Sequence, residues 1–255
     1  MQKPFDCHCH LDEIENREAI IKEAKQKLSG IINCGTNRES NMASLRLAKQ
    51  HKSFIWPALA IHPIYFHEFS KEKIEKETKF IEENINDIVA IGETGLDFAV
   101  IKKKENFDTL KKKQEEFFVE FIELAKQYDL PLIVHSRWAA TKALELLIKQ
   151  KAEKVVLHCF NAPLKDVKRA IDNGYLLSIA TNILYNQHIK QYIENFELNN
   201  FVLETDTPYL FKPINKPSNV WLVAKEIAKI KEIKEEKVIE ITNKNIKNLF
   251  GIKIC

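Results

Sequence analysis

Histidine and carboxylate residues recur at the ends of the short apolar segments of this sequence. The stretch FDCHCHLD places two histidines two residues apart, and the residues of this kind at the segment ends are His8, His10, His62, Glu93, His135, His158, Glu204 and Asp206. A single histidine on an apolar strand is more often a hydrogen-bonded core residue than a ligand. The recurrence at so many segment ends instead indicates a divalent-metal site with positions left open for water and substrate.

Apolar, β-branched segments alternate with segments of helical period along the whole chain. The predicted strands span 3–9, 29–34, 54–61, 87–93, 130–135, 154–159, 174–180 and 200–205. The predicted helices span 15–28, 38–51, 70–85, 107–128, 138–150, 163–173, 186–195, 219–231 and 235–249. Eight strands, each followed by a helix, favour the α/β class and a closed TIM-type (β/α)8 barrel over an open sheet. No linker or repeat suggests a second domain, so we expect one domain over residues 1–255.

The carboxyl ends of the strands form the face of such a barrel on which active sites are built. The metal-site candidates fall at these ends. The irregular segments 98–106 and 211–219 also follow predicted strands, so we expect both to overhang the same face.

Strand alternation separates the histidines of the first strand from its cysteines. Because residues two apart share a face, His8 and His10 point one way while Cys7 and Cys9 point the other. The same rule turns Cys159 away from His158. A thiolate zinc site is therefore disfavoured, and the remaining set of four imidazoles and two carboxylates suits one catalytic ion, or two ions bridged by a carboxylate.

Composition sets limits on partners and compartment. The formal net charge of +3 is far weaker than the basic stripe of a protein that grips long nucleic acid, although it permits a phosphate-bearing substrate. The 5 cysteines are odd in number and lack a spaced framework, which indicates reduced thiols. With no signal sequence or membrane-length apolar run, we expect a soluble cytoplasmic protein with no membrane association and no obligate protein partner.

The motifs of the chain resemble those of the TatD-type metal-dependent deoxyribonucleases, in the same order. They are DCHCHLD, AIHP, IGETGLDF, QEEFFVEFIELA, LPLIVHSR, LHCF and LETDTPYL. The resemblance implies a TIM-type barrel of the metal-dependent hydrolase superfamily. It also implies hydrolysis of DNA phosphodiester bonds, commonly from the 3′ end, with RNA as a further substrate of some members.

The resemblance also implies two divalent cations, with Mg²⁺, Mn²⁺ and Zn²⁺ as the candidates. Glu93 would bridge them and, with Asp206, would be a catalytic residue. Asp206 would hold an ion and orient or deprotonate water. The implied ligands are His8, His10 and Asp206 on one side, His135 and His158 on the other, and Glu93 between them.

Three further residues have two open interpretations each. Arg137 would hold a phosphate with its planar guanidinium or form a salt bridge at the rim. His62 would donate to a phosphate oxygen or leaving group, or be an ordinary structural histidine. Glu204 is expected to hydrogen-bond a ligand or nearby backbone rather than bind an ion itself.

The chain departs from the family pattern in two places. Asn161, Ala162 and Pro163 stand where the family often has a glycine, which would alter a backbone approach to phosphate. Lys216 stands where the family often has a glutamate, which puts a loop anchor or substrate contact in question.

Two alternative functions remain open from the sequence. One keeps the metals and changes the bond to an ester or amide, such as that of an aminoacyl-tRNA. The other is a non-catalytic, metal-stabilised scaffold or quality-control protein, which an incomplete ligand set would have favoured.

Overall fold

Parallel strands alternate with helices along the chain, in the order that the sequence predicts. The computed structural model describes residues 2–253. Its strands are β1 (Phe5–Cys9), β2 (Gly30–Cys34), β3 (Ile55–Leu59), β4 (Ala90–Asp97), β5 (Leu132–Arg137), β6 (Val155–Leu157), β7 (Leu176–Ile179) and β8 (Phe201–Leu203), and their order in the sheet follows the chain.

The α-helices follow the predicted segments closely. They are α1 (Arg17–Lys27), α2 (Arg38–Gln50), α3 (Lys71–Glu83), α4 (Phe98–Ile101), α5 (Phe107–Gln127), α6 (Ala140–Lys149), α7 (Leu164–Asp172), α8 (Gln187–Asn195), α9 (Val220–Lys231) and α10 (Glu235–Phe250). None of those within residues 2–253 combines the length and apolar character needed to cross a membrane.

The chain divides into two compact units. Unit 1 comprises Met1–Asn33, Arg46–Trp56 and Leu176–Cys255, and unit 2 comprises Cys34–Leu45 and Pro57–Tyr175. A single domain over residues 1–255 stays a prediction.

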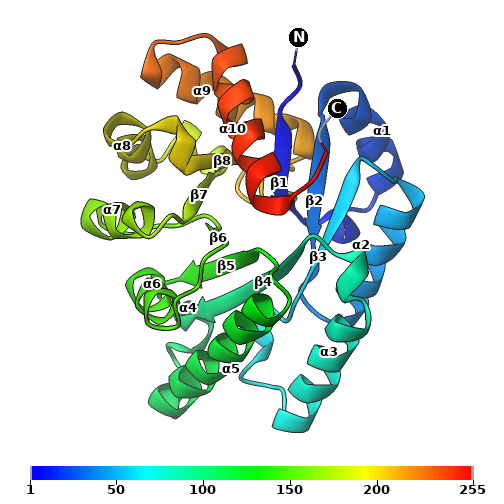
Figure 1. The fold of residues 1–255 in the computed structure, drawn as a ribbon, viewed down its shortest axis with the longest axis vertical. Helices are drawn as coiled ribbons and strands as arrows, with labels where there is room; N and C mark the ends of the chain where they lie inside the picture. Colours follow the sequence, from blue (N-terminus) through cyan, green and yellow to red (C-terminus); the bar gives the residue numbers. More distant parts are fainter. Residues whose placement is uncertain (1, 254–255) are drawn as a thin grey trace. The chain divides into compact units, whose positions relative to one another are not determined.

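Unit 1 is built on β1, β2, β7 and β8. Phe5 of β1 lies opposite Gly30 of β2, and Leu177 of β7 lies opposite Phe201 of β8. A further bridge joins Cys9 to Thr207, so β1 runs beside the segment that follows β8. Helices α9 and α10, orange and red in Figure 1, pack against each other, and α10 also packs on β8. Their buried faces recur at helical spacing, with Val223, Ala224, Ile227, Ile239 and Ile246.

Unit 2 is built on β3, β4, β5 and β6. Leu59 of β3 lies opposite Ile91 of β4, and Leu132 of β5 lies opposite Val155 of β6. The long helix α5, green in Figure 1, packs on β4 and buries an apolar face that includes Phe117, Phe118, Phe121 and Ile122. The rings of Phe66 and Phe117 meet with centroids 5.3 Å apart. This closely packed apolar layer gives β4 a rigid support.

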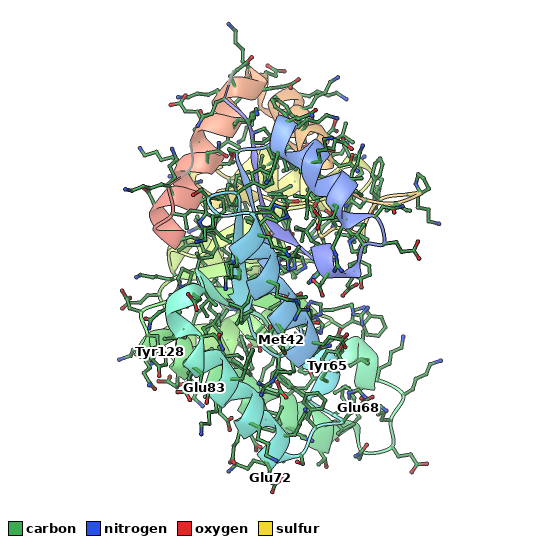
Figure 2. The ribbon with its side chains drawn as sticks, turned by 90° about the vertical axis from the view of Figure 1, so that its right-hand side faces the viewer. Met42, Tyr65, Glu68, Glu72, Glu83 and Tyr128 are labelled. Carbon is green, nitrogen blue, oxygen red and sulfur yellow. The ribbon has the colours of Figure 1, made fainter. Side chains whose placement is uncertain are left out.

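Helix α3 of unit 2 begins at a signal that the sequence carries. The Ser70 hydroxyl accepts a hydrogen bond from the backbone N–H of Lys73 at 3.2 Å and so caps the first turn. Glu72 lies in that first turn, where a carboxylate complements the helix dipole. Figure 2 shows Glu72 and Glu83 near the two ends of the helix.

The main difference from the predicted strands concerns β4, which continues to Asp97 instead of ending at Glu93. Its pairing with β5 shifts register between Ile91 and Thr94 and then continues to Asp97, opposite Arg137. The close approach of β4 to β5 depends on Gly95. Its φ is 141°, and a Cβ atom at this position would overlap the carbonyl oxygen of His135. Glu93 therefore lies inside the strand, and Asp97 lies at its end.

The segment 98–106 is also more regular than predicted. It begins with the short helix α4, whose first turn is capped by Asp97 accepting from the backbone N–H of Val100 at 3.1 Å. The segment 211–219 contains one short 3-10 turn, Pro217–Asn219, just before α9. The predicted thiol of Cys255 lies outside the described residues.

Candidate metal centre

Three buried ligand atoms converge in unit 1. The Nε2 atoms of His8 and His10 lie 3.2 Å apart, and Oδ1 of Asp206 lies 3.8 Å from the first and 3.6 Å from the second. Ligand atoms that bind one ion at about 2.1 Å are themselves about 3.0–3.5 Å apart. The three residues therefore fit a single divalent cation with little adjustment.

Backbone hydrogen bonds hold these three residues in place. The N–H of Asp206 donates to the carbonyl of His8 at 3.0 Å, and the N–H of His10 donates to the carbonyl of Thr207 at 2.7 Å. Asp206 has a left-handed backbone with φ of 57°, which is uncommon for a residue other than glycine. The strand β8 ends at Leu203, so this bond pattern, rather than strand alternation, places Asp206 beside the histidines.

Asp6, a buried residue of β1, also binds the segment that follows β8. Its carboxylate accepts hydrogen bonds from the Thr205 backbone N–H at 2.9 Å and from the Thr205 hydroxyl at 2.6 Å. Burial raises the pKa of Asp6 well above its ordinary value even though these bonds act in the opposite direction. The alternation of β1 places Asp6 on the face of His8, but sequence reasoning assigned it no role.

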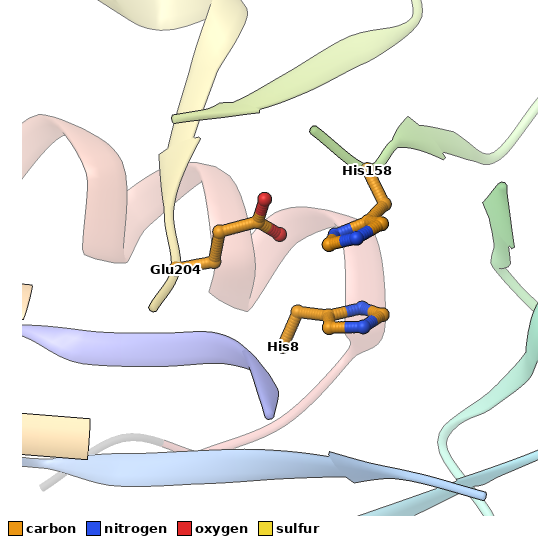
Figure 3. Close-up of side chains that lie close together, drawn as sticks. All are labelled: His8, His158 and Glu204. Carbon is orange, nitrogen blue, oxygen red and sulfur yellow. The ribbon is translucent and has the colours of Figure 1, made fainter. Parts of the chain in front are cut away.

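Glu204 is fully buried at the end of β8. Figure 3 shows its carboxylate and the imidazole of His8, extending from β8 and β1. A carboxylate oxygen of Glu204 and a ring nitrogen of His8 lie within 4.8 Å of each other. This position suits the predicted role of Glu204 as a hydrogen-bond partner of a metal-binding residue. That role stays a prediction.

Three histidines surround one carboxylate oxygen in unit 2. Oε1 of Glu93 lies 2.8 Å from Nδ1 of His135, 3.3 Å from Nε2 of His62 and 3.8 Å from Nε2 of His158. Glu93, His62 and His158 are buried, and His135 is nearly so. This second set of nitrogen and oxygen atoms has the chemistry and spacing of a divalent-metal site.

His62 faces Glu93 as a neutral donor. Burial lowers the pKa of His62 to about 4, although the nearby Glu93 acts in the opposite direction. Its Nδ1 accepts a hydrogen bond from the backbone N–H of Ile64 at 3.2 Å, so the proton of the neutral ring is on Nε2. That nitrogen is the one directed at Glu93, which makes His62 a support for the carboxylate. Its predicted contact with substrate stays a prediction.

Asp97 is the main site residue that sequence reasoning missed. Its Oδ2 accepts from Nε of Arg137 at 2.9 Å and lies 3.1 Å from Nε2 of His135. Burial alone would raise the pKa of Asp97, but the bonds with His135 and Arg137 lower it to about 2. Burial alone would likewise lower the pKa of His135, but the bonds with Asp97 and Glu93 raise it. The strand-end rule would have found Asp97 if β4 had been extended through GLDF.

Arg137 forms the salt bridge that was one of its two predicted roles. One of its terminal guanidinium nitrogens lies 2.8 Å from Oδ2 of Asp97, and its side chain remains 55% exposed. The exposed part leaves donors available to a phosphate. That second role stays a prediction.

Strand alternation fails after β6, whereas the orientation that it predicts for Cys7 and Cys9 of β1 stays a prediction. The thiol of Cys9 contacts the carbonyl of Ile32 at 3.7 Å, on the side of β2. Strand β6 ends at Leu157, and Cys159 has a left-handed φ of 46°. Its sulfur lies within 4.8 Å of a ring nitrogen of His158, so the expectation that Cys159 turns away from His158 is wrong.

Two residues anchor the loop after β8, and one of them is Lys216, which stands where the family often has a glutamate. The Lys216 ammonium contacts both carboxylate oxygens of Glu23 on α1, at 2.8 and 3.0 Å. The buried amide of Asn215 donates to the carbonyls of Thr205 and Tyr209 at 2.7 and 2.6 Å. A lysine therefore serves as a loop anchor here. At the other departure, Ala162 is buried.

Comparison with known proteins gives a match over nearly the whole chain. Residues 5–251 match the family model described as TatD related DNase. An uncharacterized metal-dependent hydrolase of Methanocaldococcus jannaschii is 34% identical, over 97% of this chain and 97% of its own. The human deoxyribonuclease TATDN3 is 30% identical, over 96% of this chain and 93% of its own.

Solved structures give the same result. The crystal structure of a TatD homologue from Escherichia coli matches with a TM-score of 0.84 and 27% identity, over 98% of both chains. A TatD-family hydrolase of Entamoeba histolytica also matches with a TM-score of 0.84, at 18% identity. Together with the strand order, these matches confirm the predicted α/β class with TIM-type (β/α)8 topology.

Proposed function

We propose, because this chain belongs to the family of TatD-related DNases, that it hydrolyses phosphodiester bonds of DNA and removes nucleotides from the 3′ end. It is a metal-dependent hydrolase that acts on ester bonds. The name of the human relative, a deoxyribonuclease, supports DNA as the substrate. The observation that carries the proposal is the convergence of His8, His10 and Asp206 at ligand spacing.

The proposed ligands form a set shared between two divalent cations, with Mg²⁺, Mn²⁺ and Zn²⁺ as candidates. Glu93 is proposed as the ligand common to both. The spacing within each unit supports the two groups, which are His8, His10 and Asp206 for one ion and His135 and His158 for the other. Imidazole nitrogens favour Zn²⁺ or Mn²⁺ in affinity, whereas Mg²⁺ prefers oxygen.

When bound, such ions make water a nucleophile at neutral pH and neutralise negative charge on phosphate oxygens. Asp206 is suited to take the proton from the attacking water, because its side chain is 13% exposed while His8 is fully buried. Glu93 is fixed by the N–H of His62, and Arg137 presents its exposed guanidinium to the phosphate. These residues bind and orient the substrate and move one proton.

The test is a nuclease assay with metal-reconstituted protein. Single-stranded DNA labelled at the 5′ end should be shortened stepwise with Mg²⁺ or Mn²⁺, and excess chelator should stop the reaction. Glu93→Gln and Asp206→Asn should each abolish cleavage, whereas Glu145→Gln, at an exposed position of α6, should not. Full activity in chelator, or in either site variant, would overturn the proposal.

The same assay separates the alternatives. A panel of DNA, RNA and aminoacyl-tRNA distinguishes phosphodiester hydrolysis from deacylation. If the protein binds metal but hydrolyses none of these three substrates, the result would favour the non-catalytic, metal-stabilised scaffold. The cytoplasmic location and the lack of an obligate protein partner stay predictions.

A further inference from the structure

Trp138 is placed at the surface in a conformation that bulky residues avoid. It is 66% exposed, the largest fraction among the large hydrophobic side chains that the structure describes. Its φ of 59° lies in the left-handed region, which costs a residue with a bulky side chain on the order of 1 kcal/mol or more. Burial of the indole does not offset this cost, and a single exposed aromatic is not by itself a site.

A cation lies over the face of the same ring. The Lys102 ammonium is 4.0 Å from the centroid of the Trp138 ring, well within the range of a cation–π interaction. Lys102 directly follows α4 and begins the exposed run Lys102–Lys104. The indole is thus held on one side by a positive charge and remains largely open to solvent.

The position of Trp138 along the chain connects it to the candidate metal centre. It directly follows Arg137, the last residue of β5, and Arg137 is bound to Asp97. His135, whose Nδ1 lies 2.8 Å from Glu93, is only three residues earlier. The backbone turns at Trp138, where the N–H of Ala139 donates to the carbonyl of Ser136 at 3.1 Å. The indole is therefore carried by the start of the loop that follows β5, directly after the strand end that carries His135 and Arg137.

We propose that Trp138 is a stacking platform for a nucleobase of the single-stranded substrate, and that Lys102 and its neighbouring lysines contact the flanking phosphates. The inference rests on the proposed function, since it assigns a base contact to a strand whose phosphodiester is cut near Glu93. An aromatic face combined with cations is the usual composition of a site that binds single strands without sequence preference. Arg137, between the base platform and His135, is placed to meet an intervening phosphate.

The test separates base stacking from phosphate binding. Oligothymidylate with cleavage-resistant phosphorothioate linkages, and an abasic strand of the same length and charge, are titrated by fluorescence anisotropy in Mg²⁺ against wild-type protein. The variants are Trp138→Ala, Trp138→Phe, which keeps an aromatic face, and Ile233→Ala, another exposed hydrophobic position, as a control. Steady-state cleavage of ordinary oligothymidylate is measured in parallel.

Trp138→Ala should bind oligothymidylate about 5- to 150-fold more weakly, the range expected for loss of one base stack. It should bind the abasic strand as wild type does, and its KM should rise with little change in kcat. Trp138→Phe should recover most of the affinity, and Ile233→Ala should not differ from wild type. Equal binding of oligothymidylate by wild type and Trp138→Ala would overturn the inference, as would an equal loss for both strands.

The failure of this inference is distinguishable from failure of the proposed function. If wild type cleaves DNA but Trp138→Ala has an unchanged KM, only the stacking role is wrong. If wild type neither binds nor cleaves any strand, both are wrong. A change in oligomeric state of Trp138→Ala with an unchanged KM would identify the indole as a protein contact and overturn the base contact.

Discussion

Asp97 and His135 are hydrogen-bonded between neighbouring strands, with Oδ2 of Asp97 3.1 Å from Nε2 of His135. The other ring nitrogen of His135 lies 2.8 Å from Glu93. A carboxylate on the far side of a ligating imidazole fixes the ring orientation and raises its basicity. Asp97 is therefore suited to position His135 in its proposed role as a metal ligand, and it binds Arg137 at the same time.

Replacing Asp97 by asparagine should weaken metal binding at the His135 side of the centre by about 10- to 100-fold. Isothermal titration calorimetry of the apoprotein with Zn²⁺ or Mn²⁺ measures the two affinities. The substitution should weaken one of the two binding events and leave the other unchanged. Asp172→Asn, at an exposed carboxylate paired with Lys168, is the matched control. Unchanged affinity in Asp97→Asn would show that the ring of His135 needs no such support.

The double variant Cys7→Ala, Cys9→Ala should keep its metal content, because strand alternation is expected to direct these thiols away from the face that carries the two histidines. His8→Ala should lose metal, since it removes one of three converging ligand atoms. Metal per protein molecule is measured by emission spectroscopy on folded, monodisperse samples. Metal loss in the cysteine variant would instead support a mixed thiolate and imidazole site.

Thr205→Val should lower the free energy of unfolding by about 1–3 kcal/mol, because it removes a hydroxyl donor from the fully buried carboxylate of Asp6. Chemical denaturation of the metal-free protein measures the change. The same substitution at Thr78, half-buried on α3, serves as the control for the loss of a hydroxyl. Equal effects at the two positions would mean that the bond between Asp6 and Thr205 adds no stability.

The contact between Lys216 and Glu23 should be visible in a titration. Hydrogen bonds from Lys216 and then Lys27 lower the pKa of Glu23 from 4.5 to about 2. A folded pKa below the unfolded value means that the stabilisation is complete above pH 4.5 and is lost as the pH falls toward 2. NMR titration should show the Glu23 pKa rising toward its ordinary value in Lys216→Met. Lys234→Met, on a different loop, should leave it unchanged.

Much of the architecture follows from short-range sequence patterns. The alternation of apolar segments with helical periods determined the number and order of the strands, because each pattern reports a local repeat of two or about 3.6 residues. The same patterns and the strand-end rule identified the histidines and carboxylates of the candidate site. The order of motifs then identified the family.

Only the tertiary structure decided how the segment ends are shaped and which side chains meet. The extension of β4 to Asp97 depends on pairing with β5, and the position of Asp206 depends on bonds to β1 from almost two hundred residues away in the chain. Left-handed backbones at Asp206, Trp138 and Cys159 break the strand repeat shortly after β8, β5 and β6 end. A local repeat cannot encode these contacts, because they are stabilised by hydrogen bonds and packing between segments distant in sequence.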